Sequence, residues 1–483
     1  MGISLNPSAL LSGQGIDVSS LVQQIISEQA GQLSVWQAQQ TAFATEDGLL
    51  EGMNNNLTNL QTAVAALADP TGALTAQAAD SSQPGIVTAT AQSNAIAGTH
   101  QIVVTYLATA GTLYTDPIAA GADASFLATG QTSGDIQLQV GGAGGTVHDL
   151  AITQGSNDTL NTLAQYINTQ SSANNWGITA SVVSDVNGAR LALFSQSSGS
   201  SSALAIVNNS NTTLSFDTPV GGTNASITID GVPFSSSSNT VIGAIQGVTL
   251  NLVSQSPDNP VQLTVGPDTS QITSAVNNFI SAYNTVVSTI NTQYVVDPTG
   301  ATPAPPLESD ISLRSLQSSM LTDAAYAIGG NSGIVNLASM GINMNNDGTL
   351  TMGLTPGGQT FAQVLAANPS AVQNFFQNSS ATGFANNFNA DLTNLTDATQ
   401  GPLNVDLAQN HAEQQDLTTT INNFETQLTA EQTQLTETYE AVNASLQSYP
   451  LLLQEITEAL GSLSTSDTIG TSSSTNPTLT SGL

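Results

Sequence analysis

Apolar residues near the C-terminus recur at steps of three and four, or seven, from Leu417 to Leu446. No Gly or Pro interrupts this stretch before Pro450. The period is that of a left-handed coiled coil, whose apolar seam packs against a second helix. A helix of roughly 45 Å at 1.5 Å per residue cannot bury its seam alone, so it needs a partner. The predicted seam residues are Leu417, Ile421, Phe424, Leu428, Leu435, Val442 and Leu446.

The same rhythm occurs near the N-terminus, with one change of phase between Leu50 and Met53 that indicates a stutter. We predict that the two terminal helices lie side by side and pair as a coiled coil. Two separate surface helices on one globule are the alternative. The N-terminal seam residues are Leu33, Trp36, Phe43, Leu50, Met53, Leu57, Leu60, Val64 and Leu67.

Between the helices the apolar period changes to two, which predicts β-strands. Strands are expected around residues 87–91, 102–106, 227–232, 247–252 and 261–265, and the strand at 227–232 should end in a tight turn. A helix capped by Asp268 or Thr269 should follow the last of them.

A second β-rich passage interrupts this series and predicts an inserted domain, beginning near Asp116. It contains an alternating strand at 136–140, a short amphipathic helix and two further strands. Asn187-Gly188 between those two strands is a hairpin signal.

The predicted fold class is α+β multidomain, with N- and C-terminal helices paired as a coiled-coil or helical-bundle leg and β-rich middle domains inserted between them. The predicted domains are 1–40, an N-terminal leg; 41–80 with 269–415, a helical leg domain; 81–115 with 224–268, a β-rich head domain; 116–223, an inserted α+β head domain; 416–461, a C-terminal coiled coil; and 462–483, a disordered Ser/Thr-rich tail.

Charge excludes several classes of partner. The 483 residues include 2 Lys+Arg, both of them Arg, against 34 Asp+Glu, for a formal net charge of -32. Such a surface repels phosphate backbones, so nucleic acids and anionic membranes are not expected partners. In acid, protonated carboxylates would leave only 2 Arg, 3 His and the terminal amine charged. We therefore hypothesise an acidic external environment, with a lineage-wide bias in composition as the equal alternative.

Cysteine is absent, so no disulfide staples the chain. No apolar run approaches the length of a membrane span, and the N-terminus lacks the basic region of a secretory signal. The expectation is export without a cleaved signal peptide and without membrane insertion.

Candidate catalytic motifs are weak. The glycines at 141–145 resemble a phosphate loop, but no Lys follows them. Residues 343–348 resemble the start of a calcium loop, but Leu354 stands where the bidentate Glu belongs, which favours a hairpin turn. The three His residues lie far apart, there is no Gly-x-Ser-x-Gly elbow, and nothing supports a glycosidase carboxylate pair. We predict no enzyme activity, no cofactor and no metal.

Several short motifs occur in a characteristic order. They are Gly15-Ile16-Asp17-Val18, Ile167-Asn168, Ile229-Asp230-Gly231-Val232, Asn239-Thr240-Val241, Gly247-Val248-Thr249-Leu250, Phe279-Ile280-Ser281-Ala282-Tyr283-Asn284, and Met340-Gly341-Ile342 followed by Asp347-Gly348-Thr349-Leu350. In these motifs the chain resembles the bacterial flagellar filament cap proteins, the hook-associated protein 2 family, over about its whole length up to Leu460. Ile167-Asn168 resembles the small module named for that pair in flagellins.

The resemblance implies a secreted structural protein that forms a homo-oligomeric ring at the distal tip of the flagellar filament. Exported flagellin subunits would fold and be inserted beneath it and would not be lost. It implies flagellin, a hook-filament junction protein and an export chaperone as partners. A surface adhesin at the filament tip, or a flagellin or junction-type filament protein, are the alternatives.

One departure from the family concerns the coiled ends, where Glu425, Glu431, Glu437 and Glu440 have no Lys or Arg to face. We expect Gln and Thr to supply the polar contacts. The paired seams could slide by a heptad as the cap advances, and a cross-link between Leu57 and Leu428 would then stop filament growth.

Overall fold

The computed structural model describes residues 17–295, 297–301, 303–378 and 380–464. Residues 1–16, which include Gly15-Ile16 of the first quoted motif, and nearly all of the predicted tail lie outside these residues. The chain divides into two compact units. The first takes residues up to Asn59, Thr285–Met320 and from Asp391 on, and the second takes Leu60–Asn284 and Leu321–Ala390. The predicted α+β multidomain class is confirmed.

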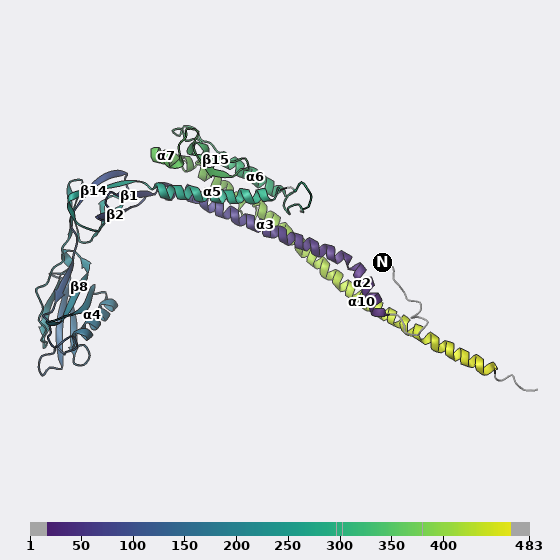
Figure 1. Cartoon of the computed structure of the whole chain (residues 1–483), viewed down its shortest axis with the longest axis horizontal. Coiled ribbons are helices and arrows are strands. Elements are labelled where there is room, and N and C mark those ends of the chain that lie inside the picture. The colour runs from purple at the N-terminus through teal and green to yellow at the C-terminus, as the bar shows by residue number, and fades with distance from the viewer. Residues whose placement is uncertain (1–16, 296, 302, 379, 465–483) are drawn as a thin grey trace, which may run out of the picture. The chain divides into compact units, whose positions relative to one another are not determined.

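The first unit is helical. Its main elements are α2 (Val18–Gln29), much of α3 (Gly31–Ala68), α10 (Pro402–Ser464), and parts of α5 (Thr269–Thr292), α6 (Ile311–Ala324) and α9 (Phe384–Leu395). Asp17 caps α2, since its Oδ1 accepts from the Ser20 backbone N–H at 3.1 Å. α2, α3 and α10 lie side by side (Figure 1). α10 starts earlier than the predicted 416 because Pro402 suits a first turn, and it continues through Pro450 into the predicted tail.

The second unit holds a first β body made of two packed sheets. One has the order β1-β14-β3-β10-β11 and the other β12-β13-β2. Side chains from both sheets share one core that includes Val87, Ile102, Ile227, Leu250 and Val261. The strands are β1 (Gln77–Ser81), β2 (Val87–Ala91), β3 (Gly98–Tyr106), β10 (Ala225–Ile229), β11 (Val232–Ser236), β12 (Thr240–Ile245), β13 (Val248–Leu252) and β14 (Ser256–Pro267).

A second β body of this unit has its own core around Phe126, Leu138 and Leu193. Its sheets have the orders β4-β8-β7 and β6-β5-β9, and α4 (Leu160–Asn174) packs against them. The strands are β4 (Ala110–Tyr114), β5 (Ser133–Val140), β6 (Thr146–Thr153), β7 (Ile178–Asp185), β8 (Gly188–Ser198) and β9 (Leu204–Ser210). The predicted boundary at 115/116 falls too late, because β4 pairs with β8 rather than with β3.

The predicted β7–β8 hairpin is confirmed, although its turn residues are Val186 and Asn187, with Asp185 paired to Gly188. The hairpin predicted near residue 345 is also confirmed by β15 (Ile342–Met344) and β16 (Leu350–Met352). Around it lie η3 (Leu337–Met340), α7 (Phe361–Ala367), α8 (Pro369–Phe376) and the start of α9. Phe279 of the quoted motif packs edge-on against Phe384 and Phe388, 5.5 and 6.1 Å between ring centroids.

Three asparagines of the quoted motifs share one structural role, in which the side-chain amide pairs with a backbone peptide. Asn168 donates to the Ala180 carbonyl and accepts from its N–H, both at 2.8 Å. Asn239 bonds Ala108 in the same two ways, at 2.9 and 2.7 Å. Asn284 donates to the Leu350 carbonyl at 2.7 Å and accepts from the Leu350 N–H at 2.6 Å. A carboxamide satisfies both peptide groups at once, which explains why Asn stands at these positions.

Candidate assembly interface

The terminal helices pair in an antiparallel sense, because contacts further along α2 and α3 fall at lower residue numbers on α10. Each contact joins side chains of the first unit. The pairs are Gln29 with Glu431 (2.8 Å), Trp36 with Phe424 (ring centroids 5.2 Å, edge-on), Gln40 with Thr418 (2.8 Å) and Asn54 with Asn404 (2.7 Å).

The predicted N-terminal seam residues fall into two groups. Leu33, Trp36 and Phe43 are half-buried. The others are at most 1% exposed: Leu50, Met53, Leu57, Leu60, Val64 and Leu67. Leu60, Val64 and Leu67 belong to the second unit.

The predicted seam residues of α10 differ in how far they are buried. Ile421 and Leu428 are buried, and Val442 is 42% exposed. Leu417, Phe424, Leu435 and Leu446 are half-buried. The antiparallel register places Leu428 between the pairs at Gln29 and Trp36, and Leu57 beyond the pair at Asn54. The expected cross-link between Leu57 and Leu428 is therefore wrong for two residues of one chain.

Amide side chains supply the polar contacts of this helix pair. Gln29, Gln40 and Asn54 donate from the N-terminal helices, while Asn410 donates to Glu46 and Gln414 to Asp47. Carboxylates accept three of these five hydrogen bonds. Amide N–H groups therefore serve as the donors to carboxylates that Lys and Arg commonly provide in other coiled coils. The expectation for Gln is confirmed.

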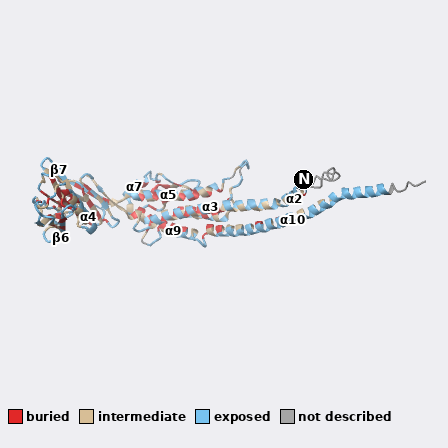
Figure 2. Cartoon of the chain, turned by 90° about the horizontal axis from the view of Figure 1, so that it is seen from below, coloured by how far each residue is buried: buried red, intermediate tan, exposed pale blue. Residues whose placement is uncertain are grey.

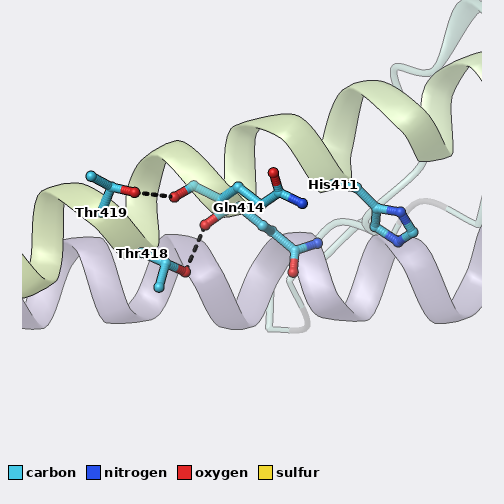
Figure 3. Close-up of a pocket in the computed structure, with 5 residues that line it drawn as sticks. His411, Gln414, Thr418 and Thr419 are labelled. Carbon is cyan, nitrogen blue, oxygen red and sulfur yellow. Dashed lines mark hydrogen bonds between the residues drawn. The ribbon is translucent and has the colours of Figure 1, made fainter.

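The expectation for Thr is mostly wrong, because Thr hydroxyls along α10 donate to carbonyls four residues earlier in the same helix. Thr418 donates to Gln414 at 2.7 Å and Thr419 to Gln415 at 3.0 Å (Figure 3). The Thr418 hydroxyl also accepts a hydrogen bond across the pair, from Gln40. This back-bonding satisfies each hydroxyl locally, so it adds little to pairing.

An acidic cluster lies within the helix pair. Burial raises the pKa of Glu46, opposed by the hydrogen bond from Asn410 and reinforced by the charges of Asp310, Asp47 and Glu413. Asp47 is buried, and its Oδ2 also lies 3.4 Å from His411 Nε2. Asp47 Oδ1 has no hydrogen-bond partner among the described residues. The ionised form of Glu46 therefore weakens this stretch of the pair at neutral pH.

A shallow depression on α10 beside this cluster is lined by His411, Gln414, Gln415, Thr418 and Thr419 (Figure 3). Its groups are amides, hydroxyls committed to their own helix, and one imidazole. Across the part of the chain that the structure describes, no three His, Asp or Glu side chains are placed to hold a metal ion. The depression offers hydrogen bonds rather than a reactive group.

Sequence reasoning missed the exposed apolar side chains after Val442. Tyr449, Leu451, Leu453 and Leu460 are each more than 60% exposed, and the final turns of α10 are exposed throughout (Figure 2). The signal was a run of leucines directly after Pro450. Within the described residues, no helix combines the length and apolarity needed to cross a membrane.

Comparisons with known proteins place these features in one family. Two models, the flagellar hook-associated protein 2 C-terminus and N-terminus, match residues 222–449 and 14–111, together more than half of the chain. The B-type flagellar hook-associated protein 2 of Pseudomonas aeruginosa PAO1 is 29% identical over 436 residues, covering 83% of this chain and 86% of that protein. The flagellar hook-associated protein 2 of Escherichia coli K12 is 28% identical over 367 residues, covering 71% and 75%.

A solved structure shares the fold. It is the crystal structure of the D1-D2-D3 domains of the flagellar cap protein FliD from Escherichia coli. The match has a TM-score of 0.56 at 24% identity and covers 75% of this chain and 99% of that chain.

Proposed function

The chain belongs to the flagellar hook-associated protein 2 family, and from this premise we propose that it forms the oligomeric cap at the distal tip of a flagellar filament. In this role it promotes the folding and insertion of exported flagellin subunits and prevents their loss. The role is structural and has no catalytic step. The observation that carries the proposal is the antiparallel pair of terminal helices, which suits a leg built to join helical subunits.

The polar chemistry of the leg supports adjustable packing. Amide-to-carboxylate hydrogen bonds such as Gln29 to Glu431 are exposed and exchange readily with water. No Lys or Arg fixes the register through ion pairs, because the chain has only two Arg, at 190 and 314. Coiled-coil seams held this way can shift between neighbouring chains at modest cost, as a cap moving ahead of each added subunit requires.

The proposed partners are further copies of this chain, flagellin, a hook-filament junction protein and an export chaperone. The proposed location is extracellular, at the filament tip, after export without a cleaved signal peptide. The raised pKa of Glu46 supports an acidic surrounding, because protonation there relieves the burial of a charge and also its repulsion from neighbouring carboxylates.

A second role as a surface adhesin is favoured by one observation. The inserted β body has a core separate from that of the first β body, so its outer loops can vary without disturbing either core. Such adhesion would add to the cap role rather than replace it.

Deletion of the gene, with the intact chain supplied in trans, tests the cap proposal. We expect loss of motility and monomeric flagellin in the culture supernatant, both reversed by the intact chain. Normal filaments in the deletion strain would refute the proposal.

The sliding step is tested by tethering the leg. The chain contains no Cys, so Gln40→Cys with Thr418→Cys introduces two unique thiols that a short bismaleimide can join. The two positions are in contact, because Gln40 Nε2 lies 2.8 Å from Thr418 Oγ1. We expect tethered caps to stop filament elongation while the untreated double variant elongates normally. Gln40→Cys alone, treated with the same bismaleimide, is the control, because a single thiol cannot close a tether between the two helices of one chain. Normal elongation by tethered caps would count against sliding.

A further inference from the structure

The first β body has an apolar groove between two edge strands. β11 ends one sheet and β12 ends the other. The groove has a volume of about 490 Å³, and we name it the edge groove. Its main lining residues are Ile96, His100, Asp230, Val232, Phe234 and Ile245.

The apolar side chains of the edge groove continue the core past the last strand. Val232 pairs with Ile229 and Phe234 with Ile227, so they point to the same face as two core residues. Yet Val232 is 65% exposed and Phe234 is 37% exposed. The core face of this sheet is thus left open to water along β11, at a cost that a docked partner would remove.

Strand addition is not the mode of docking. Pro233 lies in the middle of β11 and has no N–H to offer a further strand. On β12 the pairing with β13 shifts between Ile242 and Ile245, where Gly243 has a φ of +80°. A proline and a bulge are both devices that block edge-to-edge pairing. Because the side chains stay apolar while the backbone edges are blocked, the edge groove suits side-chain packing by a folded partner.

The charge of the edge groove is also unusual for this chain. Asp230 is the one acidic residue among the described residues that line it. Its Oδ2 lies 2.7 Å from His100 Nδ1, and its Oδ1 accepts from the Gln101 backbone N–H at 2.8 Å. That backbone hydrogen bond, with the one to His100, holds the pKa of Asp230 below its usual range. The one carboxylate is therefore already partnered.

This charge pattern selects the occupant. Two copies with a formal net charge of -32 each repel over most of their surfaces, and two Arg per chain cannot form enough ion pairs to compensate. On the β bodies, copies therefore meet most readily where the surface is apolar and its acid is partnered. A basic partner would gain more from the carboxylate-rich surfaces elsewhere on the chain.

We propose that the edge groove is the surface through which a second copy of this chain docks onto the first β body. This inference rests on the proposed oligomeric cap and names the contact that the cap would use. It predicts that added salt strengthens self-association, because salt screens the repulsion between acidic copies without weakening apolar packing.

Photo-cross-linking of the full chain identifies the occupant. Val232→Cys, in a chain with no other Cys, carries a benzophenone maleimide. Val183→Cys is the matched control, because Val183 is 53% exposed on β7 of the other β body. We expect irradiation to yield a product of twice the 49.2 kDa chain mass from position 232 and little from position 183. No product from position 232, equal yields at both positions, or an adduct with a different protein would overturn the inference.

Sedimentation of unlabelled variants gives a second measurement. Val232→Asp should weaken self-association about tenfold or more, since it places an unpaired charge in the contact. Val183→Asp should leave it unchanged. Equal self-association by Val232→Asp and the wild type overturns the inference, as does a wild-type chain that remains monomeric at high salt. Motility of the complemented deletion strain reports on the cap role separately, so either idea can fail while the other stands.

Discussion

The edge-on contact between Trp36 and Phe424 makes the helix pairing measurable as a coupling free energy between two side chains. We consider Trp36→Leu, Phe424→Leu and the double variant, each of which keeps an apolar side chain in the pair. Ring centroids 5.2 Å apart at 86° lie in the favourable edge-to-face range. Such pairs contribute about 0.5–1.5 kcal/mol beyond buried area. Both side chains are half-buried, so we expect a coupling in the lower part of that range, about 0.5–1 kcal/mol.

Hydrogen exchange of backbone amides measures this coupling locally in the full chain. A coupling of that size corresponds to about two- to fivefold in the opening equilibrium of α3 and α10 near the contact. The double variant should therefore lose less than the sum of the two single variants. Val35→Ala is the control, since Val35 is exposed and next to Trp36. A coupling of zero, or equal effects from Val35→Ala, would refute the antiparallel pairing of these residues.

Three other predictions concern charge, an amide clamp and a turn. Burial raises the pKa of Glu46, so its contribution to stability is present below the unfolded-state pKa and lost as the pH rises through the folded-state value. Glu46→Gln should therefore stabilise the leg at pH 7 but not at pH 4. Urea titrations followed by helix content measure the difference in unfolding free energy between the variant and the wild type, and a difference that does not change with pH would contradict the prediction. Asn168→Ala removes both hydrogen bonds to Ala180 and should cost about 1–3 kcal/mol in the protection of the Ala180 amide; unchanged exchange would show that the clamp is dispensable. Gly247→Ala should lower the melting temperature more than Gly243→Ala, because both have positive φ but only the Cβ at 247 meets other atoms, at 2.7–2.8 Å; equal losses would mean that the contact relaxes freely.

Local sequence patterns predicted most of the secondary structure. The alternation at Ile102 and Val104 places both in a core, because a strand turns successive side chains to opposite faces. The Asp230-Gly231 pair forms the predicted tight turn between β10 and β11, with φ of +51° and +82°, values that favour these two residue types. Apolar periods and turn chemistry act over a few residues, so they can be read directly from the chain.

Boundaries and register were less predictable. β4 lies beside β8 rather than β3, and nothing in residues 110–114 distinguishes the two neighbours. Likewise, a heptad pattern shows that α3 has a seam but not what covers it. Neither α3 nor α10 contains Lys or Arg. The sequence therefore offered no pattern of opposite charges from which the alignment of the two helices could be predicted.

The sequence by itself determined where helices, strands and tight turns occur, and that the chain has helical ends around β-rich parts. It also determined that most carboxylates must find partners other than Lys and Arg, because 34 Asp+Glu face 2 Arg. Tertiary structure decided that Trp36 meets Phe424, that Leu60, Val64 and Leu67 belong to the second unit, and that β11 and β12 border an open apolar groove. The physical reason is range. Periodicity and capping depend on neighbours along the chain, whereas partner, register and exposure depend on which distant segments compete for the same apolar face.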